Sequence, residues 1–226
     1  MKYRVIAWLL AGIVLASNAD AALLLRSNLN NEIVDQNVPT GGAAAGEPIF
    51  VDVPGMAVVR QGAFSTPSLQ ITDVSTISAH FVNYEFLNST EVTTGTLKIS
   101  FVLSFAQLGN YIVGVREQNG AAQNFYDATF TDTGFYFLPG TSGTYAATTP
   151  LTFELVFDLD ARTVDTRING APVANGVPMG GTVVRGIGSI FFGHNFDADT
   201  NGQFDLDDLV VVTPADTIFI DGFDLP

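Results

Sequence analysis

Alternation of apolar and polar side chains dominates the chain from about residue 22 onwards. Between Thr96 and Phe105 every second residue is Leu, Ile or Phe, and most residues between them are Lys, Ser or Thr. The segment Leu151–Asp160 alternates in the same way. A period of two places one set of side chains in a core and the other toward solvent. The pattern predicts β-strands that are buried on one face.

Short runs rich in Val, Ile, Thr, Phe and Tyr recur along the chain, separated by Gly, Asn, Asp and Pro, which is typical of an antiparallel all-β domain. The expected strands are Ala22–Ser27, Ile49–Asp52, Ala57–Arg60, Ser68–Thr72, Ala79–Phe86, Thr94–Phe105, Tyr111–Glu117, Asn124–Thr131, Gly134–Leu138, Leu151–Asp160, Thr163–Ile168, Ile187–Gly193, Gln203–Val212 and Thr217–Ile220. Two packed sheets accommodate that many strands better than one open sheet. The pair Asn169-Gly170 predicts a tight hairpin turn.

The first residues have the composition of a secretory signal peptide. Lys2 and Arg4 precede an apolar run, Val5–Ala16, and a small-residue pattern ends at Ala21. We expect cleavage after Ala21, and a secreted, periplasmic or cell-surface protein with no stable membrane insertion afterwards. The expected organisation is a signal peptide (1–21), a single β-sandwich domain (22–214) and a C-terminal tail or edge strand (215–226).

Charge and cysteine content narrow the classes of partner. The formal net charge is −14, and the chain contains no cysteine. An acidic surface repels nucleic acid, so we expect no nucleic-acid partner. Disulfides and thiolate metal sites are excluded, and an exported protein of this kind depends on its core and on any bound ions. The sequence gives no indication of an oligomeric state.

Four segments carry a resemblance to a known family: the strand end Phe157–Asp160, the hairpin Arg167–Gly170, the strand Ile190–Gly193 and the closing strand Phe204–Val212. Together they resemble the concanavalin A-like, laminin G-like jelly-roll superfamily, in which the hairpin often reads hydrophobic-Asn-Gly and the closing strand Asp-Asp-hydrophobic. The resemblance implies an antiparallel two-sheet jelly-roll sandwich, and it covers about the last third of the chain in detail.

The last residues resemble a second motif. The segment Ile218–Asp224 is similar to an Ile-Phe-x-Asp-Gly-Phe ending found on secreted proteins of some Gram-negative bacteria. The resemblance implies an address or docking tag outside the core. A final edge strand followed by a turn is the alternative, and the sequence leaves both open.

The densest cluster of carboxylates has the spacing of a calcium loop. Oxygen-bearing side chains recur at alternate positions, and Gly202 follows at the place where an EF-hand loop turns sharply. The ligand set given by this spacing is Asp197, Asp199, Asn201, Gln203, Asp205 and Asp208. We therefore expect a structural Ca²⁺ ion here as one of two alternatives.

The other alternative is a metal-free hairpin. The residues that follow the loop, Leu209–Val212, are mostly β-branched and favour a strand over the helix that an EF-hand loop requires. Asn201-Gly202 would then form the turn. With a period of two, Asp208 falls on the face of Phe204, Val210 and Val212, where a buried carboxylate needs a cation or several hydrogen bonds.

Catalytic motifs are sparse. Laminarinase-type enzymes of this superfamily carry Glu-x-Asp-x-x-Glu on one strand, and no such motif is present. Glu154, Asp158 and Asp160 share a strand face and form the only carboxylate group that suggests a weak glycoside hydrolase. The tyrosines that could stack on sugars are Tyr84, Tyr111, Tyr126 and Tyr136.

These observations give three functional hypotheses. The first is an exported, non-catalytic sandwich that binds glycan or extracellular matrix and holds a structural calcium ion. The second is a structural or assembly protein of the cell envelope or matrix, with the C-terminal tail as its working part. The third is the weak glycoside hydrolase with Glu154 as a catalytic residue.

Overall fold

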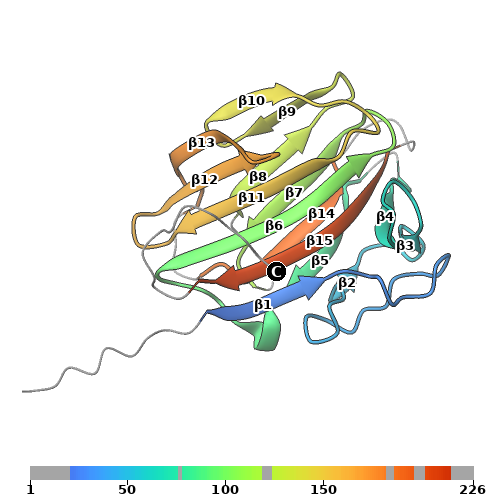
Figure 1. Ribbon diagram of the computed structural model, residues 1–226, viewed down its shortest axis with the longest axis horizontal. Helices are drawn as coiled ribbons and strands as arrows, with labels where there is room; N and C mark the ends of the chain where they lie inside the picture. The colour runs from blue at the N-terminus through green and yellow to red at the C-terminus, as the bar shows by residue number, and fades with distance from the viewer. Residues whose placement is uncertain (1–20, 76–77, 119–123, 182–185, 196–201, 215–226) are drawn as a thin grey trace, which may run out of the picture.

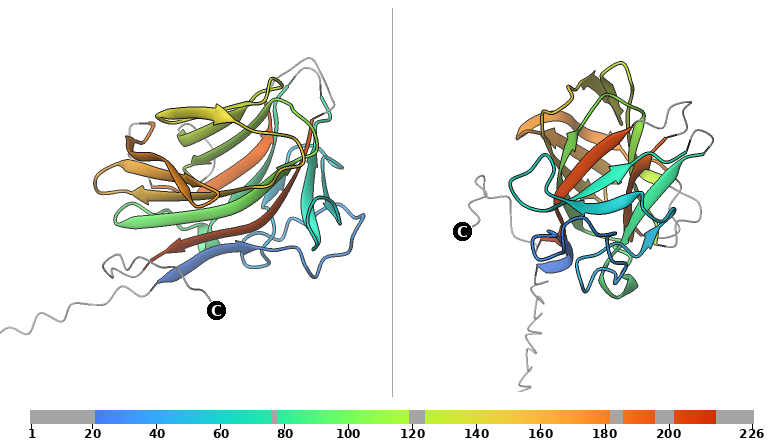
Figure 2. Two further views of the ribbon diagram at one scale, coloured as in Figure 1. Left: turned by 45° about the horizontal axis from the view of Figure 1, so that its top comes forward. Right: turned by 90° about the vertical axis from the view of Figure 1, so that its right-hand side faces the viewer.

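The computed structural model describes residues 21–75, 78–118, 124–181, 186–195 and 202–214, which form two antiparallel sheets packed face to face (Figures 1 and 2). Sheet A contains, in spatial order, β13 (Ala171–Pro178), β12 (Thr163–Ile168), β11 (Leu151–Asp158), β6 (Thr96–Phe105), β15 (Gln203–Thr213), β4 (Ser68–Thr72) and β3 (Ala57–Arg60), and β1 (Ala22–Ser27) also pairs with β15. Sheet B contains β10 (Thr141–Thr144), β9 (Phe135–Leu138), β8 (Asn124–Phe130), β7 (Tyr111–Arg116), β14 (Ser189–His194), β5 (His80–Glu85) and β2 (Phe50–Val51).

The core lies between the sheets and is built by the predicted alternation. Every second residue of β6, from Leu97 to Phe105, is buried. Phe101 stacks on Phe153 of the neighbouring strand at 5.1 Å between ring centres and meets the edge of Phe192 from sheet B at 5.2 Å. The predicted all-β, two-sheet jelly-roll sandwich is confirmed. No helix in the described ranges is long and apolar enough to cross a membrane.

Two strands were not predicted, and both lie at sheet edges. The sequence of β10 is Thr-Ser-Gly-Thr and has no apolar residue, and β13 contains Pro172 and Pro178. A proline is tolerated where a strand has only one neighbour to bond. The predicted hairpin turn is confirmed, since Asn169 and Gly170 have φ angles of 51° and 78°. The predicted signal peptide, except for Ala21, and the C-terminal tail lie outside the described residues.

A β-bulge in β15 changes which side chains of the closing strand face the core. The pairing of β15 with β6 shifts between Asp207 and Val210, and Asp208 has a φ of 50°. Beyond this bulge Leu209 and Val211 are fully buried. The predicted core position of Asp208 is wrong: its side chain is exposed, because the extra residue of a bulge shifts the alternation by one.

Candidate functional site

The outer face of sheet B carries polar and aromatic side chains at its centre. On β14, Ile190 and Phe192 point into the core, so Phe191 lies on the opposite face. One row of paired residues crosses five strands in the order Asp127, Gly114, Phe191, Asn83 and Phe50. At roughly 4.8 Å per strand, this row is about 19 Å long, enough for several sugar units.

Arg116 lies over the middle of this row. Its guanidinium carbon is 4.5 Å from the centre of the Phe191 ring, and its Nη2 donates a hydrogen bond of 3.1 Å to Asn83 Oδ1. Burial lowers the pKa of Arg116, and the charge of Asp52 opposes that shift. Among the described residues, Arg116 has no carboxylate ion-pair partner, and its Nε is buried without a hydrogen bond. The guanidinium is thus held in place by Phe191 and Asn83, and the charge of Asp52 acts on it without forming an ion pair.

Gly114 allows a carboxylate and an aromatic ring to converge beside Arg116. A Cβ atom at this position would lie 2.2 Å from the Phe191 ring and 3.1 Å from Asp127 Oδ1. Any side chain would therefore force the ring to move. The glycine brings Asp127 and Phe191 together above the sheet.

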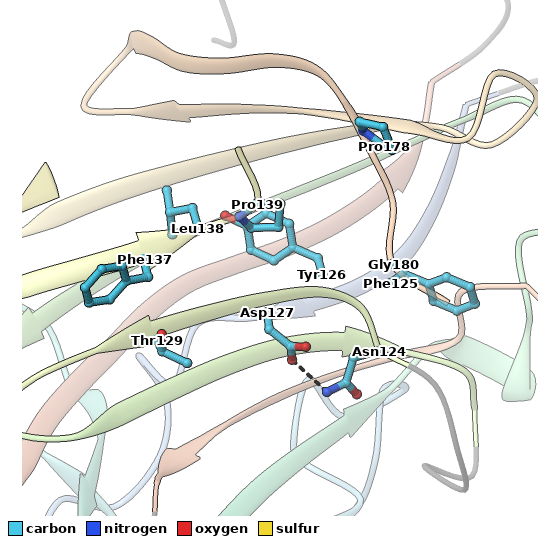
Figure 3. Close-up of a pocket in the computed structure, with 10 residues that line it drawn as sticks. All are labelled: Asn124, Phe125, Tyr126, Asp127, Thr129, Phe137, Leu138, Pro139, Pro178 and Gly180. Carbon is cyan, nitrogen blue, oxygen red and sulfur yellow. Dashed lines mark hydrogen bonds between the residues drawn. The ribbon is translucent and has the colours of Figure 1, made fainter. Parts of the chain in front are cut away.

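Asp127 is the titratable group best suited to proton transfer on this face. Its Oδ1 accepts a hydrogen bond of 2.7 Å from Asn124 Nδ2 (Figure 3). Burial raises the pKa of Asp127, and the bond from Asn124 partly opposes the shift. A carboxylate with a raised pKa is a stronger base than one in water, and its acid form is present closer to neutral pH.

A hollow of about 390 Å³ opens beside Asp127, between β8, the β9–β10 turn and the end of β13. Figure 3 shows Phe137 and Thr129 along this hollow, with Pro139 and Pro178 at its sides. Phe137 is 51% exposed and pairs with Thr129 across the strands. An exposed aromatic ring next to polar groups suits the apolar face of a sugar.

Solved structures of several carbohydrate-active enzymes have a fold similar to that of this chain. The catalytic domain of a glycoside hydrolase family 131 protein from Coprinopsis cinerea matches 84% of this chain and 93% of its own, with a TM-score of 0.57 and 15% identity. An alginate lyase of Polysaccharide Lyase family 7 matches 85% and 93%, with a TM-score of 0.54 and 12% identity. A sialidase matches 79% of this chain with a TM-score of 0.53 and 16% identity, but the chain spans only 19% of that sialidase.

The chain has a concanavalin A-like jelly-roll fold, and at these identities the likeness establishes the fold alone. No protein-family model matches the sequence, and no curated protein matches it. The comparisons nevertheless correct the expectation of a non-catalytic protein, because the similar structures are enzymes. The missing Glu-x-Asp-x-x-Glu motif argues against one type of glycosidase and leaves other carbohydrate chemistry open.

The residues predicted as calcium ligands are only partly described. Asp197, Asp199 and Asn201 lie outside the described residues. Gln203 and Asp205 line a hollow on the outer face of sheet A, whereas Asp208 is exposed at the bulge. Within the described part of the chain, no group of three His, Cys, Asp or Glu residues could hold a metal. The calcium hypothesis remains a prediction.

Two of the three alternative catalytic carboxylates, Glu154 and Asp158, lie on β11 in the sheet opposite Arg116, and Asp160 lies in the turn that follows, so the predicted common strand face is wrong for Asp160. Glu154 forms ion pairs with Lys98 at 2.7 Å and with Arg167 at 3.7 Å. Asp158 accepts hydrogen bonds from the backbone of the following turn. These contacts explain both carboxylates as structural groups.

The tyrosines expected to stack on sugars do not face solvent. Tyr84, Tyr111 and Tyr126 are buried in the core, and Tyr136 packs against it. The exposed rings on this side of the molecule are phenylalanines. The periodicity of β5, β7 and β8 places these tyrosines inward with the neighbouring Val and Phe residues.

The central residues of the candidate site were missed by the sequence analysis. The segment Tyr111–Arg116 contains the only available signal: Gly114 and Arg116 alternate with buried Val113 and Val115. A glycine inside a strand marks the close approach of another group. That signal does not reveal the partner, because Phe191 and Asp127 are distant in sequence.

Proposed function

We propose that the protein is an exported enzyme that cleaves a uronate-containing polysaccharide on the outer face of sheet B. The observation that carries the proposal is the Arg116 cation. It stacks on Phe191, forms no ion pair with a carboxylate among the described residues, and lies on the same face of sheet B as Asp127. A sugar carboxylate supplies the missing anion. The carbohydrate-active enzymes with a similar fold support a glycan as the substrate class.

The sign of the charge at the site favours elimination over hydrolysis. Glycoside hydrolysis passes through an oxocarbenium-like transition state, which a nearby arginine destabilises. Removal of a proton next to a carboxylate builds up negative charge instead, which a positioned guanidinium stabilises. Arg116 therefore fits a β-elimination.

In the proposed reaction Arg116 and the Asn83 amide bind the uronate carboxylate. Asp127 takes the proton from C5, the C5–H electron pair forms the C4=C5 double bond, and the C4–O4 bond breaks. The leaving O4 takes a proton from the Asp127 carboxyl, which returns the residue to its starting state. The products are one fragment with a new reducing end and one that ends in an unsaturated uronate. Together they contain all the atoms of the substrate, and no water is consumed.

The experiment uses the full chain with alginate and polygalacturonate as acidic substrates and a soluble β-glucan as a neutral one. We expect ultraviolet absorbance from an unsaturated product together with new reducing ends on an acidic substrate. Asp127→Asn should reduce the rate by about 10²- to 10⁴-fold, the usual contribution of a general acid or base. The matched control is Asp158→Asn, which removes a carboxylate on the other sheet.

Two outcomes contradict the proposal. Cleavage that gives reducing ends without the unsaturated product would identify a hydrolase. Equal activity of Asp127→Asn and Asp158→Asn would remove Asp127 from the mechanism. Retained folding of both variants, checked by circular dichroism, keeps these results interpretable.

Export and calcium binding belong to the same proposal as supporting features. The signal-peptide pattern supports export, and the spacing from Asp197 to Asp208 supports a stabilising Ca²⁺ ion. A thermal melt of the protein with Ca²⁺ and with a chelator tests the ion. A rise in melting temperature that Asp199→Ala abolishes supports the site, and an unchanged melt favours the metal-free hairpin.

A further inference from the structure

A second row of polar side chains lies on the outer face of sheet A, on the other side of the sandwich. Ser104 on β6 pairs with Asp205 on β15, which pairs in turn with Gln70 on β4. Neighbouring side chains in such a row lie about 5 Å apart. All three therefore converge on one region of the sheet.

The loop between β3 and β4 covers one side of this row. Ala63 donates its backbone N–H to Asp205 Oδ2 at 3.2 Å, and a Cβ atom at Gly62 would lie 2.7 Å from Asp205 Oδ1. Gln70 Nε2 donates to Oδ1 at 3.4 Å. Asp205 is only 4% exposed, and burial raises its pKa against the effect of these hydrogen bonds.

Ser104 provides the observation that points to a ligand. Its side chain is 1% exposed, and its Oγ is buried without a hydrogen-bond partner among the described residues. A buried hydroxyl without a partner costs about 1–3 kcal/mol in desolvation. Such a group is unusual in a native protein unless another molecule completes its bonding.

Ser104, Asp205 and Gln70 line a hollow of about 430 Å³. Ala63 and Ala106 contribute apolar surface to its lining, and Thr148 and Gln203 contribute further polar groups. Phe105 borders the hollow, but its ring packs in the core on the other side of β6. The volume falls within the range of about 300–1,000 Å³ that is usual for small-molecule sites. A mixed lining of apolar surface and converging polar groups is the general composition of such sites.

We propose that this hollow binds a neutral polyhydroxylated ligand of about the size of one sugar unit. One ligand hydroxyl donates to Asp205 and accepts from Ser104 Oγ, and the apolar carbon surface of the ligand lies against the exposed Ala63 and Ala106. Asp205 also belongs to the ligand set predicted for Ca²⁺ from the sequence. N–H groups of Ala63 and Gln70 already point at its two oxygens, so a cation fits this residue less well than a ligand hydroxyl does, and a Ca²⁺ ion would depend on the other residues of that set. The site does not depend on the proposed cleavage reaction, since it lies on the opposite sheet.

The test measures binding of glucose, galactose, mannose and mannitol to the full chain by ligand-observed NMR and by thermal shift. We expect at least one of them to bind to the wild-type protein. Ser104→Ala should weaken that binding by about tenfold, which corresponds to the loss of one hydrogen bond. The same variant should leave the melting temperature without sugar unchanged or higher, because it removes an unsatisfied buried group.

Two variants serve as controls. Ser100→Ala removes a hydroxyl four residues away on the same strand and should leave sugar binding unchanged. Asp127→Asn should also leave it unchanged, which separates this site from the one on sheet B. The variant Asp205→Asn should weaken binding as Ser104→Ala does.

Three outcomes overturn the proposal. One is the absence of binding by all four compounds, and another is binding that neither Ser104→Ala nor Asp205→Asn weakens. The third is an Asp205-dependent rise in melting temperature with CaCl₂ and no effect of the sugars, which would identify a cation site.

Discussion

The guanidinium of Arg116 lies 4.5 Å from the ring centre of Phe191, and the two residues come from adjacent strands of sheet B. The ring covers one face of the cation and leaves its edge, with the N–H donors, for other partners. Asn83 Oδ1 accepts a hydrogen bond from one of these donors, Nη2. The stacking fixes the plane of the guanidinium and so gives a bound carboxylate a defined orientation.

Replacement of Arg116 by lysine should weaken binding of an acidic oligosaccharide by about tenfold. An ammonium keeps the charge but loses the planar stacking and the paired donors. Isothermal titration in the Asp127→Asn background measures affinity without turnover. Arg167→Lys on sheet A is the matched control, and an equal loss in both variants would mean that only net charge matters.

Gly114→Ala should destabilise the protein by about 1–3 kcal/mol, the usual cost of an overpacked site. The new methyl group would overlap the Phe191 ring, so Phe191→Leu in the same chain should recover part of the loss. Urea unfolding of the two single variants and the double variant measures this coupling. Strictly additive effects would show that the two residues do not compete for the same space.

The stability of the protein should depend on pH through Asp127. Burial raises the folded-state pKa of Asp127 above its ordinary value, so the native state keeps this proton to a higher pH than the unfolded chain does. Its stabilising contribution is complete below the ordinary pKa of the residue and is lost as the pH rises through the raised one. Relative to Asp127→Asn, the wild-type protein should therefore lose free energy of unfolding over that window. Urea titrations between about pH 3 and pH 7 measure the difference, and parallel curves would contradict the raised pKa.

The bulge in β15 predicts an unexpected order of mutational effects. Leu209→Ala should cost about 2–5 kcal/mol because Leu209 is fully buried, whereas Val210→Ala should cost less than about 1 kcal/mol. Uninterrupted alternation from Phe204 would give the reverse order. Chemical denaturation of both variants distinguishes the two registers.

The fold was predictable because most strands bury one face and keep a strict period of two. The prediction was wrong where that period is interrupted: Asp208 is the extra residue of a bulge, and a local pattern gives no sign of the partner strand that skips it. The edge strands β10 and β13 were missed for a related reason. They contribute little to the core and so lack the apolar signal.

The candidate site on sheet B could not be predicted to the same extent. Its central residues are ordinary in their own segments, and their relationship depends on four strands being neighbours in space. Arg116 and Phe191 are separated by a long stretch of sequence, and only the order β8, β7, β14, β5 brings Asp127, Phe191 and Asn83 into one row. Sequence order alone gives no such adjacency.

The pairing of β1 with β15 has a consequence for how the chain folds. Ala22 lies opposite Thr213, and β15 also bonds to β6 and β4 (Figure 1). The middle of sheet A therefore cannot form until nearly the whole described chain has been synthesised. Folding is slow when strands that are distant in sequence must pair. The edge of β6 that bonds to β15 stays unpaired until β15 has been added. Slow folding of this kind would leave the chain unfolded during the export that we propose.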